Sequence, residues 1–268
     1  MTSVLQVQTL TKKFGDNVAV DAVSFDLQAG GALGIVGESG SGKTTVARML
    51  VGLETPTSGQ VVIPSGEDAK GARMRRARHI QMVFQDPYMS LDPRLSAAAA
   101  LDHVLKLHFG GTRTSRRARV DELLDSVNLG TREANALPRE LSGGQRQRIA
   151  IARALAVEPE VLVLDEATSA LDVSVQAQIL TLLNQIRRER GVAYVFVSHD
   201  LAVIREVCDE LIVMYRGLIV ERDACDEVLT NPKHPYTRLL VESVPRPGWD
   251  PKVIAQNRRR IEQELGRV

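Results

Sequence analysis

Apolar and polar residues follow two patterns that predict strands. They alternate over residues 4–10 and 22–27, which is typical of half-buried strands. Residues 161–164 are continuously apolar, as expected of a strand that a parallel sheet buries on both faces. Further apolar stretches predict strands at residues 32–36, 60–63, 80–84, 193–197, 210–215 and 218–220, with Gly217 in the hairpin turn between the last two.

Between these strands, apolar residues recur at the spacing of a helix. The pattern predicts helices at residues 45–51, 97–109, 115–129, 145–157, 173–190, 201–207 and 237–242. Strands and helices therefore alternate along the chain, which favours an α/β fold. The stretch 96–137 is helical throughout and interrupts the alternation, so we expect a helical subdomain at about residues 90–157.

Composition excludes several classes of protein. Of the 268 residues, 44% are hydrophobic and 25% are charged, as in ordinary globular domains, and a net charge of +1 argues against a dedicated nucleic-acid binder. The two cysteines, Cys208 and Cys225, form no C-x-x-C pair and fit a reducing cytosol. Because the sequence shows no signal peptide and no run of about 18 apolar residues, we expect a cytosolic chain that reaches a membrane only through a partner.

A glycine-rich segment between the strand at 32–36 and the helix at 45–51 fits the P-loop pattern G-x-x-x-x-G-K-[ST]. Its backbone N–H groups and the helix N-terminus are suited to phosphate oxygens. Lys43 would reach the outer phosphates and the Thr44 hydroxyl would hold Mg²⁺. The alternative is a glycine-rich turn without a ligand. The nucleotide-binding residues predicted here are Gly37, Glu38, Ser39, Gly40, Ser41, Gly42, Lys43, Thr44 and Thr45.

Two acidic residues follow the apolar strand at 161–164. Asp165 would anchor the Mg²⁺ shell and Glu166 would orient or deprotonate the attacking water. Taken alone, the pair could equally be acids placed favourably at a helix N-terminus. Downstream of a P-loop, the pair favours the second half of a nucleoside triphosphatase site.

With these motifs in place, the chain resembles the ATP-binding subunit of an ABC transporter over about residues 3–240. The resemblance implies an α/β P-loop NTPase (ABC ATPase) core with a mixed sheet, an N-terminal antiparallel β subdomain and the helical subdomain. The motifs that carry it are, in order, the P-loop, Gln85, Leu141-Ser142-Gly143-Gly144-Gln145, Asp165-Glu166, Ser169-Ala170-Leu171-Asp172 and His199.

This family implies a head-to-tail dimer that holds two ATP molecules at the interface. Each ATP would touch the P-loop of one subunit and the signature segment of the other. On the signature side the residues that bind ATP would be Ser142, Gly143, Gly144 and Gln145, at the start of a helix whose N-terminus favours the γ-phosphate.

Four further roles come from the resemblance. Phe14, in the expected loop 12–16, would stack on adenine, although an aromatic there is otherwise a loop anchor. Gln85 would contact Mg²⁺ or water and sense the transmembrane partner. Asp172 would bridge across the dimer. His199 would contact the γ-phosphate and hold Glu166, although a histidine after a strand is usually structural.

Two stretches resemble the peptide/nickel importer ATPases more narrowly. They are the loop at residues 85–94 and the Asn-Pro-Lys-His-Pro-Tyr segment within residues 231–240. Some relatives carry a cysteine-rich tail that holds an iron–sulfur cluster, and the absence of cysteine after Pro245 predicts none here. No V-G-E-x-G segment precedes the signature, which favours an importer over an exporter.

The sequence therefore predicts the ATPase of an import system for oligopeptides, dipeptides or a related solute. Its partners would be a second ATPase subunit, two permease subunits and, indirectly, an extracytoplasmic solute-binding protein. It would work at the cytoplasmic face of the membrane. The ATPase domain is expected at residues 1–245 and a basic tail, expected to be helical, at 246–268. The alternative is a soluble accessory ATPase of an enzyme complex such as carbon–phosphorus lyase.

Overall fold

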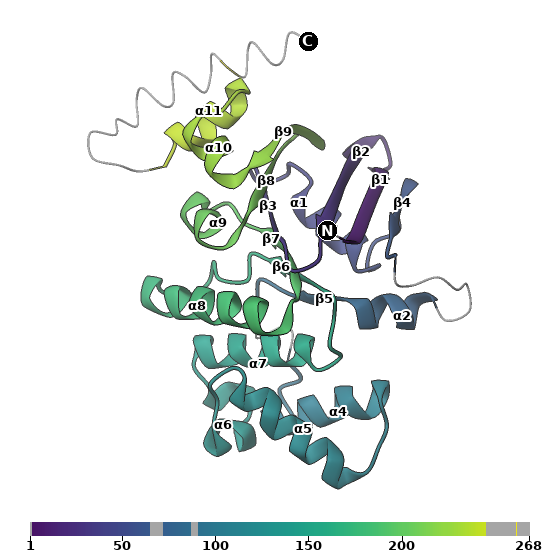
Figure 1. The fold of residues 1–268 in the computed structure, drawn as a ribbon, viewed down its shortest axis with the longest axis vertical. Helices are drawn as coiled ribbons and strands as arrows, with labels where there is room; N and C mark the ends of the chain where they lie inside the picture. The colour runs from purple at the N-terminus through teal and green to yellow at the C-terminus, as the bar shows by residue number, and fades with distance from the viewer. Residues whose placement is uncertain (1, 65–71, 87–90, 245–260, 262–268) are drawn as a thin grey trace.

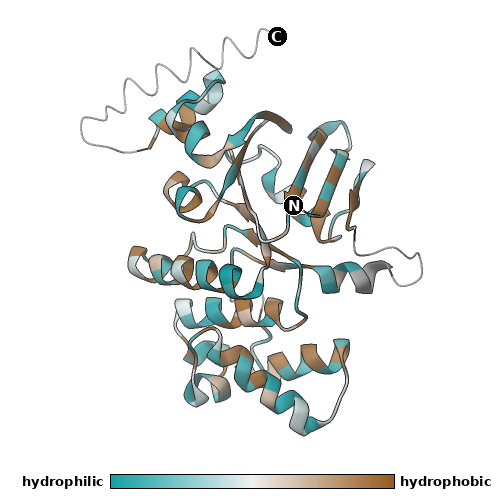
Figure 2. Cartoon of the chain, viewed as in Figure 1, coloured by the Kyte–Doolittle hydropathy of each residue, from teal (hydrophilic) through white to brown (hydrophobic). Residues whose placement is uncertain are grey.

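The computed structural model describes residues 2–64, 72–86, 91–244 and 261. Two sheets form the centre of this part of the chain, and a group of helices forms one end of it (Figure 1). Brown, hydrophobic residues concentrate in the central strands, whereas helices α7 (Gly143–Leu155) and α8 (Val173–Arg190) carry both hydrophobic and hydrophilic residues (Figure 2). Within the described ranges, no helix is both long enough and apolar enough to cross a bilayer.

The smaller sheet is antiparallel and is built mainly from the N-terminus. Its strand order is β2-β1-β4, with bounds Ser3–Phe14 for β1, Asn17–Gln28 for β2 and Ser58–Val62 for β4. The alternation seen in the sequence places Leu5, Val7 and Phe25 in the core, where they pack with one face of the larger sheet. This sheet is the N-terminal antiparallel β subdomain that the sequence predicts.

The larger sheet is mixed, in the order β5-β6-β7-β3-β8-β9. All neighbouring pairs are parallel except β8 and β9, which form the antiparallel hairpin that turns at Arg216 and Gly217. Every residue of β3, β6 and β7 is buried, as their continuous apolar runs require. The bounds are β3 Ala32–Val36, β5 Ile80–Val83, β6 Val161–Asp165, β7 Ala193–Val197, β8 Glu210–Tyr215 and β9 Leu218–Ala224.

Successive residues of the larger sheet enter two different cores. Leu33, Val163 and Val195 pack with the N-terminal sheet and helix α1, Lys43–Leu50. Leu162 and Phe196 pack on the other face with helices α7, α8 and α9. Helices α7, α8 and α9 run Gly143–Leu155, Val173–Arg190 and Leu201–Val207, respectively.

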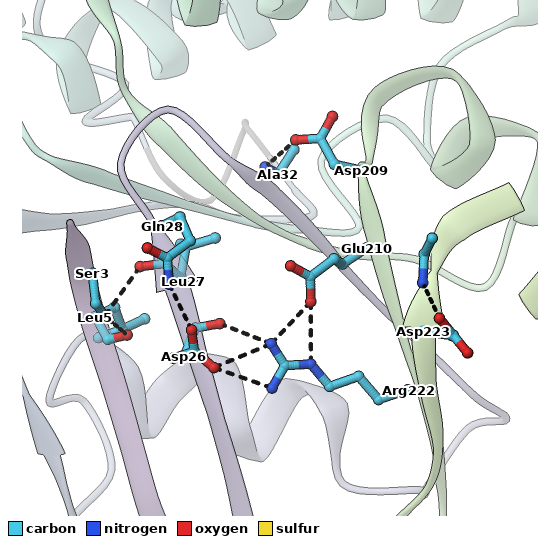
Figure 3. Close-up of polar contacts among 11 residues, drawn as sticks. Ser3, Leu5, Asp26, Leu27, Gln28, Ala32, Asp209, Glu210, Arg222 and Asp223 are labelled. Atoms are coloured by element: carbon cyan, nitrogen blue, oxygen red, sulfur yellow. Dashed lines mark hydrogen bonds and ion pairs between the residues drawn. The ribbon is translucent and has the colours of Figure 1, made fainter. Parts of the chain in front are cut away.

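Arg222 of β9 ties the two sheets together (Figure 3). Its Nη2 atom lies 2.9 Å from Oε2 of Glu210 on β8 and 3.3 Å from Oδ1 of Asp26 on β2. Nearby, Oδ2 of Asp209 accepts the backbone N–H of Ala32 at 2.9 Å, which fixes the start of β3. The strand that leads into the P-loop is therefore anchored at its far end.

The helical subdomain lies at the end of the molecule farthest from helix α11, Pro235–Glu242 (Figure 1). The helices of this subdomain differ from the sequence prediction in two ways. The second helix runs 113–125 rather than 115–129, because the Thr112 side chain accepts the N–H of Ser115 and caps it earlier. Two short elements, α6 and η1, were not predicted. The bounds are α4 Ala97–His108, α5 Arg113–Asp125, α6 Thr131–Asn135 and η1 Pro138–Glu140.

The C-terminal part adds two helices beside β9. Helix α10, Cys225–Thr230, was not predicted, and α11, Pro235–Glu242, begins two residues earlier than expected because Pro235 takes its first position. Helix α2, Ala72–His79, precedes β5. The predicted basic tail at 246–268 lies outside the described residues except for Ile261, as does the middle of the loop at 85–94.

Candidate active site

The predicted motifs meet at one edge of the larger sheet because it is parallel there. The P-loop follows β3, Asp165 ends β6 and Glu166 follows it, and His199 follows β7. The carboxyl ends of adjacent parallel strands share one edge, where α/β proteins place their ligand sites. Residues more than 120 positions apart in the sequence thus become neighbours, as Thr44 and Asp165 do.

The P-loop is held so tightly that two of its glycines have no room for a side chain. A Cβ atom at Gly37 would lie 2.2 Å from the carbonyl oxygen of Met214, and one at Gly42 would lie 2.5 Å from that of Ala19. Both glycines also have positive φ, 151° and 104°. The Ser41 carbonyl accepts the N–H of Gly217 at 3.0 Å. The loop therefore rests on β8 and on the start of β2.

Lys43 is buried against the loop that it belongs to. Its Nζ atom donates to the carbonyl oxygens of Gly37 and Glu38, at 2.7 Å each. Burial lowers the pKa of the ammonium group, while the carboxylates of Glu166, Asp165 and Glu38 oppose that shift. The lysine thus supplies a poorly hydrated positive charge at the inner side of the loop.

Thr44 and Asp165 place two oxygen atoms side by side. The Thr44 hydroxyl donates to Oδ1 of Asp165 at 3.3 Å. Asp165 is buried, and this burial raises the pKa of its carboxyl group. In the described part of the chain no group of three or more His, Cys, Asp and Glu side chains is suited to a metal. Magnesium at phosphates needs only one or two carboxylates, so these oxygens fit it.

Glu166 and His199 form a second polar pair. The Nδ1 atom of His199 lies 3.3 Å from Oε1 of Glu166, and the histidine side chain is 63% exposed. Glu166 adopts a left-handed backbone conformation, with φ of 48°. Hydrogen bonds hold it there, since its N–H donates to Val197 and its carbonyl accepts from Ser169. Strain of this kind is retained where the surroundings fix the residue, often at functional sites.

A cavity of about 460 Å³ is lined by Lys43, Thr44, Glu166 and His199 among these groups, but not by Asp165. Phe14 lies at its mouth as the last residue of β1 and is 48% exposed. This corrects the prediction that Phe14 lies in a loop: the loop is only the turn to Asn17, which pairs with Phe14. Asn17 and Ala19 were not predicted as site residues. The lining residues are Phe14, Asn17, Ala19, Ser39, Gly40, Gly42, Lys43, Thr44, Thr45, Glu166 and His199.

The signature segment lies elsewhere, at the start of α7. Ser142 caps the helix, since its Oγ accepts the N–H of Gln145 at 3.2 Å and its own N–H donates to Oε1 of Gln145 at 2.9 Å. Gly144 packs on Val175, whose Cγ1 would lie 2.5 Å from a Cβ there, and Gly143 is exposed. Among the described residues, no member of this segment lines the P-loop cavity.

Two further predicted residues, Gln85 and Asp172, are not among the residues that line the cavity. Gln85 is exposed and its Nε2 donates to Oγ of Ser169 at 3.5 Å. Asp172 caps helix α8, where its Oδ1 accepts the N–H of Val175 and the hydroxyl of Ser174. These hydrogen bonds lower the pKa of Asp172.

Comparison with known proteins shows which family the chain belongs to. A family model described as "ABC transporter" matches residues 20–169. The chain belongs to the ABC transporter family. A second model, described as "Oligopeptide/dipeptide transporter, C-terminal region", matches residues 220–266 of this ABC protein. The family assignment agrees with the resemblance found in the sequence.

Curated relatives of this ABC protein match most of its length. The oligopeptide transport ATP-binding protein OppF of Bacillus subtilis is 44% identical over 92% of this chain and 84% of its own. The di/tripeptide transport ATP-binding protein DppF of Pseudomonas aeruginosa is 45% identical over 92% of this chain and 76% of its own.

Solved structures share the fold. A dimeric post-hydrolysis state of the ATP-binding cassette MJ0796, bound to ADP and Pi, is 32% identical, with a TM-score of 0.72 over 82% of this chain and 98% of that one. The structure of cbiO1 from Clostridium perfringens, part of the ABC transporter complex cbiONQ, is 26% identical, with a TM-score of 0.78 over 92% and 98%. The predicted fold class is confirmed, and the protein is an ATPase that binds ATP.

Proposed function

We propose that this ABC ATPase powers an importer of oligopeptides, dipeptides or a related small solute, such as a nickel chelate or an opine. The observation that carries the proposal is the match of residues 220–266 to the C-terminal region of oligopeptide/dipeptide transporters. The names of the relatives OppF and DppF agree with it. None of these comparisons supports the alternative, a soluble accessory ATPase of an enzyme complex.

In this proposal the chain works as a head-to-tail dimer. The P-loop cavity and the residues 142–145 are separate in one chain, so a second chain, the same or homologous, would bring its signature segment over the ATP. The N-terminus of α7 would then direct its unpaired N–H groups and the Ser142 hydroxyl at the γ-phosphate. The dimeric state of the MJ0796 cassette supports this arrangement.

The P-loop would bind the triphosphate. The Lys43 ammonium would exchange its bonds to the Gly37 and Glu38 carbonyls for charge-assisted bonds to the outer phosphates. The backbone N–H groups of residues 39–45 would surround the phosphate chain, and Phe14, at the mouth of the cavity, would stack on adenine. Asp172 would reach across the dimer from the start of α8.

Thr44, Asp165 and Gln85 would hold Mg²⁺ through their oxygen atoms. The adjacent hydroxyl and carboxylate of Thr44 and Asp165 support this, and Gln85 would be an additional ligand, directly or through water. When bound, Mg²⁺ neutralises charge that develops on the phosphates. Burial raises the pKa of Asp165, so a cation beside it would favour the ionised form.

Glu166 would accept the proton of the attacking water, and His199 would orient the Glu166 carboxylate. The 3.3 Å distance from His199 Nδ1 to Glu166 Oε1 allows the imidazole to fix the carboxylate while its other nitrogen faces the phosphate. The hydrogen bonds that hold Glu166 in its strained conformation support a fixed position for its side chain. Positioning contributes most of the catalysis in phosphoryl transfer.

We assign the remaining features in the same way. Residues 1–245 form the ATPase domain, with the helical subdomain at about 90–157 and the tail at 246–268. Two permease subunits would dock beside Gln85 and the helical subdomain, at the cytoplasmic face of the membrane. An extracytoplasmic solute-binding protein would act through those subunits, and nucleic acid would not be a partner.

Affinity purification and uptake test this function. The tagged chain should co-purify with two integral membrane proteins from detergent-solubilised membranes. Deleting its gene should abolish uptake of labelled oligopeptides, and the Lys43→Ala variant should fail to restore it. Recovery of soluble enzyme subunits instead, together with unchanged uptake, would contradict the proposal.

A further inference from the structure

A tyrosine near the C-terminus contacts the P-loop directly. The phenolic oxygen of Tyr236, on α11, accepts the backbone N–H of Glu38 at 2.9 Å. The two residues are 198 positions apart, and Tyr236 is 2% exposed. The contact joins the two matched segments, since Tyr236 lies in the one matched by the C-terminal model and Glu38 in the one matched by the ABC model.

The loop before Tyr236 is fixed on β9. The two carboxylate oxygens of Glu221 accept the backbone N–H groups of Lys233 and His234, at 2.8 and 2.9 Å. His234 then caps α11, since its Nδ1 accepts the N–H of Tyr236 at 3.2 Å, and Pro235 occupies the first helical position. The helix therefore starts at a defined place, and Tyr236 sits in its first turn.

The ring of Tyr236 is held as well as its backbone. It packs on the ring of Tyr215, with centroids 4.4 Å apart and an interplanar angle of 43°. Tyr215 ends β8, and the preceding Met214 carbonyl is the group that leaves no room for a side chain at Gly37. The first residues of the P-loop thus lie between β8 and α11.

Both backbone polar groups of Glu38 are hydrogen-bonded. Its N–H donates to Tyr236, and its carbonyl accepts from Lys43 at 2.7 Å. If Lys43 binds phosphate instead, the Glu38 carbonyl loses the lysine as its hydrogen-bond donor. The hydrogen bond from the Glu38 N–H to Tyr236 can remain. A loop that is already ordered before ATP arrives loses less conformational entropy on binding.

We propose that Tyr236 is a positioning residue for ATP binding, whose hydroxyl holds the first turn of the P-loop in its phosphate-binding conformation. The inference rests on the proposed use of the P-loop to bind ATP. It gives the C-terminal segment an influence on nucleotide affinity that acts through the P-loop. Tyr236 acts through Glu38 and the loop, and it is not itself a ligand of the phosphates.

The Tyr236→Phe variant removes the hydroxyl and keeps the ring. Loss of one hydrogen bond to an ordered loop should raise the ATP dissociation constant and KM about two- to ten-fold. The value of kcat should stay within about two-fold, because the residue does not touch the reacting atoms. Tyr215→Phe is the matched control, since it removes the hydroxyl of the neighbouring ring and should leave KM unchanged.

Amide hydrogen exchange on the unmodified full-length protein gives a second measurement. Without nucleotide, the Glu38 amide should exchange slowly, and Tyr236→Phe should accelerate this exchange while Tyr215→Phe does not. Rapid exchange of the Glu38 amide in the unmodified protein would overturn the proposal. An ATP affinity of Tyr236→Phe equal to that of the unmodified protein would also overturn it.

The result separates this inference from the proposed function. If the unmodified protein and Lys43→Ala bind ATP equally, the assignment of the P-loop itself fails. If only Lys43→Ala loses affinity, the P-loop assignment stands and the role of Tyr236 fails. A lowered melting temperature with unchanged KM in Tyr236→Phe would show a purely structural role and would overturn the inference.

Discussion

His199 Nδ1 lies 3.3 Å from Oε1 of Glu166, although the two residues follow different strands. Strands β6 and β7 are adjacent and parallel, so residues just after their ends meet. The histidine is exposed toward the cavity and the glutamate is held by backbone hydrogen bonds. This pair is the centre of the proposed hydrolytic chemistry.

Replacing Glu166 with Gln should leave ATP binding intact and slow hydrolysis by about 10²–10⁴-fold, the usual contribution of a general base. Gln keeps the shape of the side chain but is a very poor proton acceptor. Single-turnover hydrolysis and an ATP titration measure the two effects. Glu206→Gln, on the exposed side of α9, is the control and should behave as the unmodified protein. Parental hydrolysis in Glu166→Gln would show that this role is wrong.

Lys43→Ala should weaken ATP binding by about 1.5–3 kcal/mol, the range for a hydrogen bond to a charged group, or roughly 10- to 150-fold. The variant also leaves the carbonyls of Gly37 and Glu38 without their ammonium donor. Isothermal titration with ATP measures the affinity. Lys106→Ala, an exposed lysine of α4, is the matched control. Equal affinities in the two variants would count against the assigned role of Lys43.

Asp165→Asn should stabilise the nucleotide-free protein at neutral pH and impair hydrolysis. Burial raises the pKa of Asp165, so the ionised form costs folding free energy once the pH exceeds its unfolded pKa. Asn removes the charge and still accepts a hydrogen bond from Thr44. A gain of ~1 kcal/mol would raise the melting temperature by about 2–4 °C for a protein of this size. A lower melting temperature at pH 7 would contradict this account.

Glu221→Gln should destabilise the protein at neutral pH, by about 1–3 kcal/mol, because one charge-assisted hydrogen bond becomes neutral and the amide NH2, which cannot accept, leaves the other backbone N–H without its acceptor. Burial raises the pKa of Glu221, but the backbone N–H groups of Lys233 and His234 and the nearby Thr237 hydroxyl together outweigh it and lower the pKa from its ordinary value of 4.5. The stabilisation is therefore present above the unfolded pKa and is lost as the pH falls through the folded pKa.

Urea unfolding of both proteins at a series of pH values measures that difference. The gap between the unmodified protein and Glu221→Gln should be full at pH 7 and should close below the ordinary glutamate pKa of 4.5. A gap that grows as the pH falls would show that the sign is wrong.

The sequence predicts the sheet and the P-loop well, because both depend on local patterns. Continuous apolar runs mark strands such as β6, and glycine spacing marks the loop between β3 and α1. The short elements α6 and η1 carry too few residues for a periodic pattern. The sequence predicts a loop at Phe14 because Gly15 follows it, whereas the pairing of Phe14 with Asn17 keeps it in β1.

Contacts between distant segments leave no local pattern in the sequence. Nothing in the residues around Tyr236 indicates a bond to Glu38, since the contact depends on how α11 packs beside β8. The same holds for Asn17 and Ala19, which line the cavity only because β2 lies next to the P-loop. A motif of charged residues or glycines can be recognised in the sequence, whereas packing between distant segments becomes visible only in the folded structure.

We expect hydrolysis to need two chains, since residues 142–145 lie outside the P-loop cavity of their own chain. Steady-state hydrolysis measured over serial dilution of the purified protein, at saturating ATP, tests this most directly. If two chains are required, activity per molecule should fall with dilution and the rate should become second order in protein. Activity per molecule that stays constant down to protein concentrations at which only monomer is present would contradict it.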